Sequence, residues 1–368
     1  MKKKIAVLSG DGIGPEVVEQ GLKVLDAIAE RYEHNFKYIH ANIGAIAIKK
    51  TGNPLPKATV EACLDADAVL LGAIGDPKFD NNPDLKVRPE QGLLRLRRKL
   101  GLYCNIRPVK TYAKLLHLSP LKEENIKGVD MVIYRELTGG IYFGEKGTSK
   151  DGQTAFDTCS YSVDEIERIA KSAFEAAMRR RKKVTLIDKA NVLETSRLWR
   201  RVVTEFAKQY PKVELDFMFV DNAAMQLVIH PKQFDVILTS NMFGDIISDE
   251  SSVLVGSLGM LPSSSQGIKT SLFEPIHGSY PQAAGKDIAN PIATIHSVVL
   301  MLKSFGLFEE AASIDQAVSS CLEKGVGTPD LQPSITYTCS QMGDVISSII
   351  TGANVKYDRV SDGISTII

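Results

Sequence analysis

Short apolar runs alternate with longer amphipathic stretches along this chain, and the alternation constrains its fold more than any other feature. The runs are short enough to be buried strands, and the stretches are long enough to be helices. Regular alternation of the two indicates an α/β protein with a largely parallel sheet. The expected strands are residues 4–8, 68–74, 103–109, 131–135, 184–187, 215–220 and 234–238. The expected helices are residues 15–30, 90–100, 163–181, 193–209, 223–230, 244–254 and 296–304.

Polar residues recur where the expected strands end. They are Asp11, Arg135, the pair Asp188 and Lys189, Asp221 and Asn241. Ligands of open α/β sheets bind at the carboxyl ends of the strands. One such residue alone is more often only the mark of a strand end. The repetition at one strand after another favours a shared cleft.

Length, charge and cysteine content narrow the class of protein. A chain of 368 residues is longer than one compact core usually spans, so two domains are expected. Lys plus Arg and Asp plus Glu each number 44, and this balance gives no reason to expect nucleic acid or a membrane as a partner. No apolar stretch approaches the roughly 20 residues of a membrane helix. Five scattered cysteines without a CxxC pair favour reduced thiols and a cytoplasmic location.

Two carboxylates in the segment NMFGDIISDE are candidate metal ligands. Asp245 and Asp249 are four residues apart, so a helix would place them on one face, roughly 5–6 Å apart at Cβ. A divalent cation such as Mg²⁺ would offset their repulsion. A solvated acidic helix face is the alternative, and the two interpretations are about equally probable from the residues alone. The apolar continuation SSVLVGSLGM favours the metal.

Several other residues have side chains suited to acid chemistry. Arg97, Arg107 and Arg135 could bind the carboxylates of a dianion, because guanidinium groups bind carboxylates bidentately. Tyr142, in ELTGGIYFGE, could donate a proton, and Lys189 could act as a base. Each of these residues, considered alone, is more often an ordinary surface, ion-paired or packed side chain.

Two glycine-containing loops are candidate nucleotide sites. The opening GDGIGP follows a strand, but Pro15 stands where the dinucleotide-binding fingerprint needs glycine, so a Rossmann fold is not indicated. The loop 273–291, FEPIHGSYPQAAGKDIANP, has the composition of a ligand loop. By itself that composition is only suggestive.

Together these segments resemble the isocitrate/isopropylmalate dehydrogenase family. The resemblance is carried by GDGIGPE, PEQGLLRLRRKLGLYCNIRP, YRELTGGIYFGE, DKANVLETSRLWR, VDNAAMQL, NMFGDIISDE with the following GSLGM, and the loop 273–291, which stand in the family order over nearly the whole chain. It implies the family's own two-domain α/β fold, which is not a Rossmann fold. The first domain would comprise residues 1–100 and 255–368, and the second residues 101–254, with an arm near 151–161. It also implies a homodimer whose active sites are shared between subunits.

The resemblance assigns roles residue by residue. Arg97, Arg107 and Arg135 match the arginines that bind substrate, and Tyr142 with Lys189 matches the catalytic pair. Asp221, Asp245 and Asp249 match the ligands of Mg²⁺ or Mn²⁺, with Asp221 also on the substrate side, and Lys189 and Asp221 would come from the neighbouring subunit. The matches to NAD-binding positions are Glu90, Glu274, His277, Gly278, Ser279, Gln282 and Asn290.

Substrate choice within the family depends on the helix before Arg97. Leu93 and Leu94, with Val192, would form an apolar wall suited to an isopropyl group, since a buried carboxylate against leucine is costly. One departure concerns the cofactor: Gln282 stands where NAD-type relatives carry an acid that binds the adenosine ribose. No residue pair typical of NADP-type relatives is present, so NAD is the expected cofactor.

The expected activity is therefore NAD-dependent oxidative decarboxylation of 3-isopropylmalate in leucine biosynthesis. A related β-decarboxylating dehydrogenase acting on malate, tartrate or homoisocitrate is the first alternative. The second is a non-catalytic regulatory subunit of a hetero-oligomer, although Tyr142, Lys189 and the three aspartates are all present. A metal-dependent hydrolase, which would not need the loop 273–291, is a third.

Overall fold

A computed structural model describes residues 1–79, 86–353 and 357 of the chain. The chain divides into two compact units. The first comprises residues 1–100, 257–264 and 269–368, and the second comprises residues 101–256 and 265–268. The independent domains expected from the sequence, with boundaries at 100/101 and 254/255, stay a prediction. No helix in the described ranges combines the length and apolarity that crossing a membrane requires.

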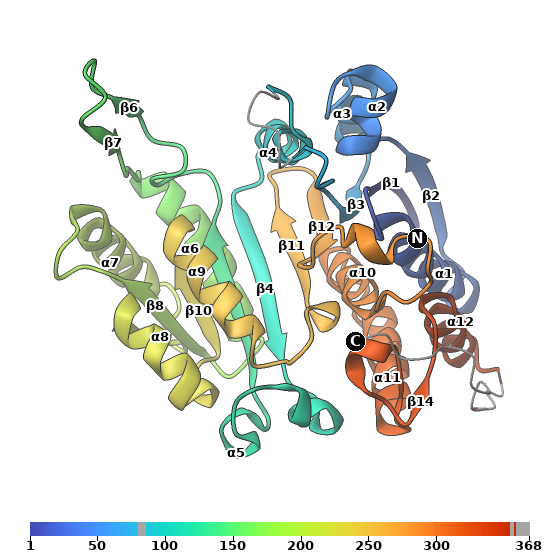
Figure 1. The fold of residues 1–368 in the computed structure, drawn as a ribbon. Helices are drawn as coiled ribbons and strands as arrows, with labels where there is room; N and C mark the ends of the chain where they lie inside the picture. The colour runs from blue at the N-terminus through green and yellow to red at the C-terminus, as the bar shows by residue number, and fades with distance from the viewer. Residues whose placement is uncertain (80–85, 354–356, 358–368) are drawn as a thin grey trace. The chain divides into compact units, whose positions relative to one another are not determined.

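The first unit contains both chain ends and a sheet whose strands follow the order β2-β1-β3-β12-β11 (Figure 1). β1 pairs in parallel with β2 and β3, and β12 pairs in parallel with β3. Helix α1 packs against α10 and α12, and α10 contacts β3 and β12. The elements are β1 (Lys2–Gly10), α1 (Gly14–Arg31), β2 (Asn35–His40), α2 (Ala45–Thr51), α3 (Lys57–Asp65), β3 (Ala68–Ala73), α4 (Pro89–Leu100), η3 (Leu258–Met260), β11 (Pro262–Gln266), β12 (Ser271–Pro275), η4 (Pro281–Ala283), α10 (Ile292–Ser304), α11 (Phe308–Glu323), β13 (Val326–Gly327), η5 (Pro329–Leu331), β14 (Ile335–Thr336) and α12 (Cys339–Ile350).

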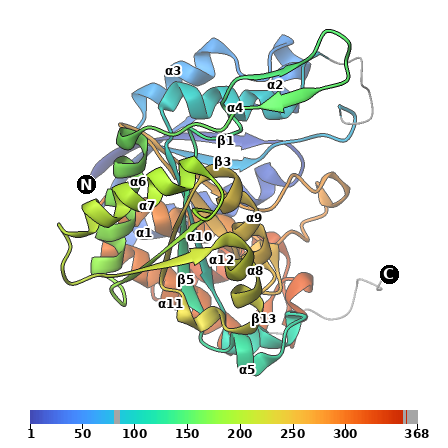
Figure 2. The same ribbon diagram turned by 90° about the vertical axis from the view of Figure 1, so that its left-hand side faces the viewer.

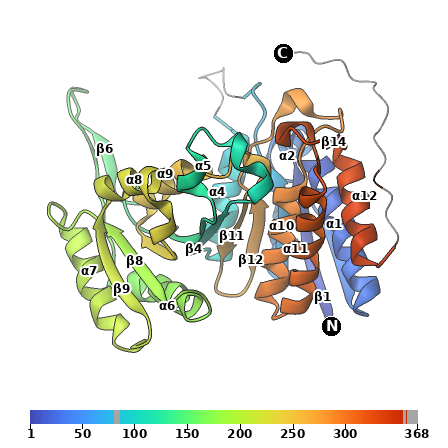
Figure 3. The same ribbon diagram turned by 90° about the horizontal axis from the view of Figure 1, so that it is seen from below.

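The second unit contains the end of β11 and the strand order β4-β5-β10-β8-β9. β4 and β5 are antiparallel, and the other pairs of this order are parallel. Helices α6 and α7 cover one face of these strands, and α8 and α9 cover the other (Figure 3). The elements are β4 (Cys104–Lys110), η1 (Ala113–Leu118), α5 (Glu123–Ile126), β5 (Asp130–Glu136), β6 (Lys146–Thr148), β7 (Ala155–Asp157), α6 (Val163–Met178), β8 (Lys183–Asp188), α7 (Glu194–Ala207), β9 (Glu214–Phe219), α8 (Val220–Ile229), η2 (Pro231–Gln233), β10 (Val236–Thr239) and α9 (Asn241–Ser252).

The expected α/β class is confirmed. The sheet was expected to be largely parallel, and it is mixed because β4 and β5 pair in antiparallel orientation. Every expected strand and helix overlaps an observed element. Local sequence explains the clearest cases. All six residues of β3 are apolar or glycine and all are buried, as in a central parallel strand. Helix α6 begins with a capping box between Ser162 and Glu165.

The expected arm near 151–161 corresponds to a small antiparallel ribbon of β6 and β7, with Lys146 paired to Asp157. The ribbon projects from the second unit (Figures 1 and 2). Phe156 on β7 is 50% exposed, which is unusual for a large aromatic side chain. The ribbon therefore presents an apolar side chain to its surroundings.

Candidate active site

Arg135 is the centre of a polar cluster in the second unit. It lies near the carboxyl end of β5 and is buried. Its Nε donates to the carbonyl oxygen of Asn241 over 2.9 Å, and its Nη2 donates to Asn241 Oδ1 over 3.0 Å. Its Nη1 pairs with the carboxylate of Asp245, one turn further along α9. These contacts fix the direction of the guanidinium group.

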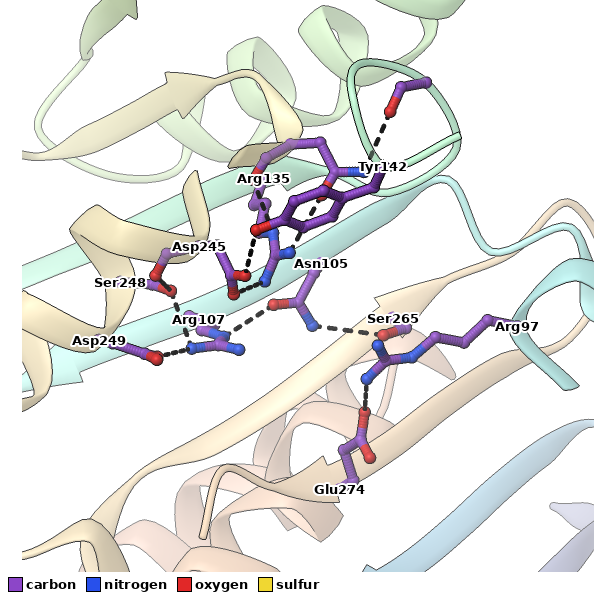
Figure 4. A network of polar contacts seen from close by, with 12 residues as sticks. Arg97, Asn105, Arg107, Arg135, Tyr142, Asp245, Ser248, Asp249, Ser265 and Glu274 are labelled. Atoms are coloured by element: carbon purple, nitrogen blue, oxygen red, sulfur yellow. Dashed lines mark hydrogen bonds and ion pairs between the residues drawn. The ribbon is translucent and has the colours of Figure 1, made fainter. Parts of the chain in front are cut away.

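A second arginine pairs with the second carboxylate of the same helix. Arg107 Nη1, from β4, donates to Asp249 Oδ1 over 2.6 Å and to Ser248 Oγ over 2.8 Å. Its Nε donates to Asn105 Oδ1 over 2.9 Å. Figure 4 shows the guanidinium groups of Arg107 and Arg135 beside Asp249 and Asp245. The structure therefore brings together two expected arginines and two expected metal ligands.

Gly244 allows α9 to approach β5 this closely. A Cβ atom at Gly244 would lie 2.5 Å from Cγ and 2.7 Å from Cβ of Arg135, and 3.1 Å from Cγ2 of Thr239. Real side chains almost never approach so closely, so an alanine would force either the arginine or the helix to move. Close packing of α9 against β5 therefore requires glycine at position 244.

Tyr142 joins this cluster from the turn after β5. Its hydroxyl donates to Asp245 Oδ2 over 2.9 Å, and its ring lies 6.0 Å from the guanidinium carbon of Arg135. Figure 4 shows the ring over Arg135 with the hydroxyl directed towards Asp245. Partial burial and the neighbouring carboxylate both raise the pKa of Tyr142 above its ordinary value. The phenol therefore keeps its proton at neutral pH and can donate it.

Lys189 and Asp221 form a separate ion pair in the same unit. Lys189 Nζ donates to Asp221 Oδ1 over 2.7 Å, and this hydrogen bond lowers the pKa of Asp221. The Lys189 backbone N–H is bound by Ser196 Oγ at 3.1 Å. Within the residues that the structure describes, no three His, Cys, Asp or Glu side chains are grouped to hold a metal. A site using Asp221 with Asp245 and Asp249 stays a prediction that requires a second subunit.

Arg97 and the leucines of α4 belong to the first unit. Arg97 Nη2 donates to Glu274 Oε1 on β12 over 2.9 Å. Its Nε is buried and has no hydrogen-bond partner within the described part of the chain. Leu93 is half-buried and Leu94 is 50% exposed. An aliphatic surface and a guanidinium group with an unused donor are therefore presented by one helix.

The expected cofactor loop lies against the opening glycine segment. Gly12 has a φ of +57°, and a Cβ atom there would lie 1.9 Å from the carbonyl oxygen of Ser279, which itself accepts from Ile13 N over 2.8 Å. A Cβ atom at Gly75 would lie 3.3 Å from Glu90 Oε1 and 3.4 Å from Ser279 Oγ. The structure thus places Glu90, Ser279 and the first glycine loop together.

His277 is the residue of this loop most suited to meet a ligand. Its Nδ1 contacts the carbonyl oxygen of Gly278 at 3.0 Å, whereas its Nε2 is buried without a partner among the described residues. Burial lowers the pKa of His277, so the imidazole is neutral at pH 7. Val192, in the second unit, and Gln282 are exposed. Both are accessible to a ligand or to a second subunit.

Asn290 has structural bonds that the sequence did not predict. It is buried, its Nδ2 donates to Asp330 Oδ2 over 3.0 Å, and its Oδ1 accepts from Ile292 N at the start of α10. Asp11, at the first strand end, accepts from Ala45 N, Ile46 N and Gly75 N. Asn290 and Asp11 therefore both stabilise the backbone of neighbouring segments.

Other contributors to the site were not predicted from the sequence. Glu136 is fully buried and accepts from Thr138 N and Oγ1 and from Gly139 N, which fixes the turn that presents Tyr142. Arg200 forms two hydrogen bonds to buried Asp188, next to Lys189. Glu136 bonds to residues two and three positions ahead in no motif that sequence reasoning recognised, and Arg200 meets Asp188 only when α7 packs beside the end of β8.

The whole chain was also compared with known protein families and structures. The family model for isocitrate/isopropylmalate dehydrogenase matches residues 4–346 of the chain. The chain belongs to this family. The resemblance expected from the sequence is therefore confirmed, and so is the family fold.

Individual members of the isocitrate/isopropylmalate dehydrogenase family are similar over nearly the full length. The 3-isopropylmalate dehydrogenase of Bacteroides fragilis strain YCH46 is 55% identical over 332 residues, covering 90% of this chain and 94% of that protein. That of Thermotoga maritima is 55% identical over 348 residues, covering 93% and 98%. The crystal structure of isocitrate dehydrogenase from Methylococcus capsulatus superposes with a TM-score of 0.82 at 34% identity, covering 95% and 99%.

Proposed function

We propose that this protein is a 3-isopropylmalate dehydrogenase, which converts (2R,3S)-3-isopropylmalate and NAD to 4-methyl-2-oxopentanoate, CO₂ and NADH in leucine biosynthesis. The observation that carries the proposal is the cluster of Arg107, Arg135, Tyr142, Asp245 and Asp249. It combines carboxylate-binding cations, acidic metal ligands and a proton donor, which a β-decarboxylating dehydrogenase needs at one place.

The choice of substrate is supported by two independent observations. The relatives that are 55% identical carry the name 3-isopropylmalate dehydrogenase, whereas the superposed isocitrate dehydrogenase is 34% identical. The accessible side chains on α4 beside Arg97 are Leu93 and Leu94. An isopropyl group gains from contact with leucine, and a third carboxylate would lose hydration there.

Asp245 and Asp249 fit a divalent cation by their chemistry. Their hard carboxylate oxygens lie one turn apart on α9 and are accessible, with side-chain exposures of 34% and 72%. When bound there with Asp221 of a partner subunit, Mg²⁺ or Mn²⁺ would supply Lewis acidity beside the substrate's hydroxyl group. The two carboxylates are at present neutralised by Arg107 and Arg135. Adding a divalent cation and a dianionic substrate together leaves that charge balance unchanged.

The loop around His277 fits an adenosine group. The buried, unpartnered Nε2 of His277 needs a hydrogen-bond partner, and the aromatic ring offers a stacking surface. Ser279 and Glu90, which both lie beside Gly75, and Gln282 of the same loop provide further polar groups, and Arg97 of α4 binds Glu274 on β12, the strand that leads into the loop. NAD bound there would accept the hydride from carbon 2. Exposed Gln282 would bind the ribose hydroxyls without a charge.

Two side chains handle protons in this proposal. Lys189, with its amine directed to Asp221, receives the proton of the 2-hydroxyl group from the neighbouring active site. Tyr142 returns a proton to carbon 3 after CO₂ has left, and its raised pKa keeps it protonated until then. Arg97, Arg107 and Arg135 orient the two carboxylates of the substrate.

A homodimer would supply the missing partner residues. Helices α8 and α9 contact one another, and exposed apolar side chains stand on them and at the C-cap of α9: Met225, Val228, Ile229, Ile246 and Val253. Such a patch on a charge-balanced protein favours burial against a second copy. Lys189, which directly follows β8, and Asp221, in the first turn of α8, would then be carried into the partner's site.

The proposal is tested by following NADH formation with purified protein, Mg²⁺ or Mn²⁺, and one acid at a time from 3-isopropylmalate, malate, tartrate and isocitrate. We expect the highest kcat/KM with 3-isopropylmalate, and loss of activity when EDTA removes the metal. A higher kcat/KM with another acid would refute the substrate assignment. Failure to reduce NAD with all of them would refute the enzymatic assignment.

A further inference from the structure

Tyr161 connects two parts of the candidate site although it belongs to neither. It is the residue before Ser162, the N-cap of α6, and lies at the end of the segment that returns from the β6–β7 ribbon. Its hydroxyl oxygen accepts the backbone N–H of Asn241 over 2.9 Å. Asn241 is the first residue of α9 and is buried, so its N–H would otherwise be an unsatisfied helix-end donor.

The ring of Tyr161 also determines where the turn before Tyr142 lies. A Cβ atom at Gly139 would lie 2.8 Å from Cε1 of Tyr161, and one at Gly140 would lie 2.2 Å from its hydroxyl oxygen. Gly140 has a φ of +77°, and its N–H donates to the carbonyl oxygen of Ser160 over 2.9 Å. The backbone of the turn therefore rests directly on the tyrosine, with no side chain between them.

The opposite edge of the ring is fixed by Trp199, the only tryptophan of the chain. The two rings meet edge to face with their centroids 5.3 Å apart, and Trp199 is buried. Burial raises the pKa of Tyr161, so its hydroxyl group stays protonated and neutral. The ring is thus held by the core of the second unit on one side and supports the site on the other.

From Tyr161 two short routes lead to the reacting groups. The first runs through Asn241, whose carbonyl oxygen and Oδ1 both accept from Arg135. The second runs through the turn at Gly139, whose carbonyl oxygen accepts from Asn241 Nδ2 over 3.2 Å, and continues to Tyr142. Asp245 joins both routes, because it binds Arg135 and Tyr142.

We propose that Tyr161 is a positioning residue of the dehydrogenase reaction: it fixes the start of α9 and the Gly139–Gly140 turn relative to one another, and so sets the distance between Arg135 and Tyr142. This rests on the function proposed above. Within the described part of the chain, no hydrogen bond or ring contact joins Tyr161 to a residue assigned to substrate, metal or cofactor. Its effect is transmitted by the two routes just described.

Tyr161→Phe is the direct test, because it removes the hydroxyl group and keeps the ring. We expect kcat/KM for 3-isopropylmalate to fall about tenfold, since small misplacements of reacting groups are costly. The KM for NAD should stay within about twofold, because the residues assigned to NAD lie in the first unit. Unchanged Trp199 fluorescence would show that the ring is still in place.

Tyr103→Phe is the matched control. Tyr103 is buried in the same unit, and its hydroxyl lies 3.4 Å from Ser172 Oγ on α6. The Tyr103→Phe variant should lose some thermal stability and keep the wild-type kcat/KM. If Tyr161→Phe has the same kcat/KM as Tyr103→Phe, Tyr161 has only a structural role and the proposal is wrong.

Two further measurements keep the test decisive. Hydrogen exchange of a peptide spanning residues 239–246 should be faster in Tyr161→Phe than in wild type, and unchanged exchange would contradict the proposal even if the wild type reduced no NAD. If Tyr161→Phe does not fold, Gly139→Ala replaces it, because the new methyl group pushes the ring while the hydroxyl remains. Loss of substrate-side kcat/KM in that variant supports the proposal, and full retention overturns it.

Discussion

Replacing Gly244 by alanine tests whether the approach of α9 to Arg135 matters for activity. The added Cβ would lie 2.5 Å from Cγ of Arg135, about 1 Å closer than ordinary van der Waals contact. Overpacking of this kind costs about 1–3 kcal/mol. Alanine gains about 1 kcal/mol over glycine in a helix. The net destabilisation should therefore be at most about 2 kcal/mol, and the protein should still fold.

The effect of Gly244→Ala on catalysis should be larger than its effect on stability. Either Arg135 or α9 with Asp245 must move by about 1 Å, and such a displacement can lower kcat/KM about 100-fold. Steady-state kinetics with 3-isopropylmalate and a thermal melt would measure both effects. Gly21→Ala in α1 is the matched control, because its added methyl group would lie 3.1 Å from Cγ2 of Thr294 on α10, and both residues belong to the first unit. If Gly244→Ala keeps kcat/KM within twofold of wild type, the packing argument is refuted.

Three further outcomes follow from the site. Asp249→Asn should weaken Mg²⁺ or Mn²⁺ binding and turnover together while costing less than about 1 kcal/mol of stability, because the Asp249 carboxylate of its ion pair with Arg107 is 72% exposed; calorimetric metal titration showing wild-type affinity would exclude Asp249 as a ligand. Tyr142→Phe should lower kcat by about 10²-fold or more, and the wild-type rate should show no loss from ionisation of Tyr142 below its ordinary pKa of 10.0, since that pKa is raised; a pH–rate profile checks both. Burial lowers the pKa of His277 below 6.5, so the unfolded chain binds this proton more readily and stability should fall as the pH drops through 6.5. Thermal melts at several pH values should show a shallower fall for His277→Gln, and equal slopes would contradict the assignment.

The second unit illustrates how far sequence patterns reach. The apolar runs that became β5, β8 and β10 were recognisable because strands inside the sheet are buried on both faces. The strand β11, PSSSQ, was not recognisable, because its residues are polar. Four of its five residues are buried, and pairing within the sheet and side-chain hydrogen bonds, such as that between Asn105 and Ser265, make their burial possible. The edge strand β2, with charged and half-buried residues, gave equally little signal.

The residues of the candidate site were predictable from the sequence, but their contacts were not. Motifs in the sequence were enough to name Arg107, Arg135, Tyr142, Asp245 and Asp249, because the chemistry of each side chain is a local property. Their mutual contacts were not predictable, since they join residues 103 to 142 positions apart in the chain. Tyr161, whose partner Asn241 is 80 positions away, was missed for that reason.

The sequence by itself determined the family, the α/β class and the identity of the reactive side chains, because these depend on residue type, spacing and periodicity. Only the tertiary structure decided which arginine neutralises which aspartate, which glycines must stay bare, and which buried tyrosine supports the turn before Tyr142. Those relations depend on close packing and on the pairing of buried polar groups. Both are fixed only when distant segments of the chain come into contact.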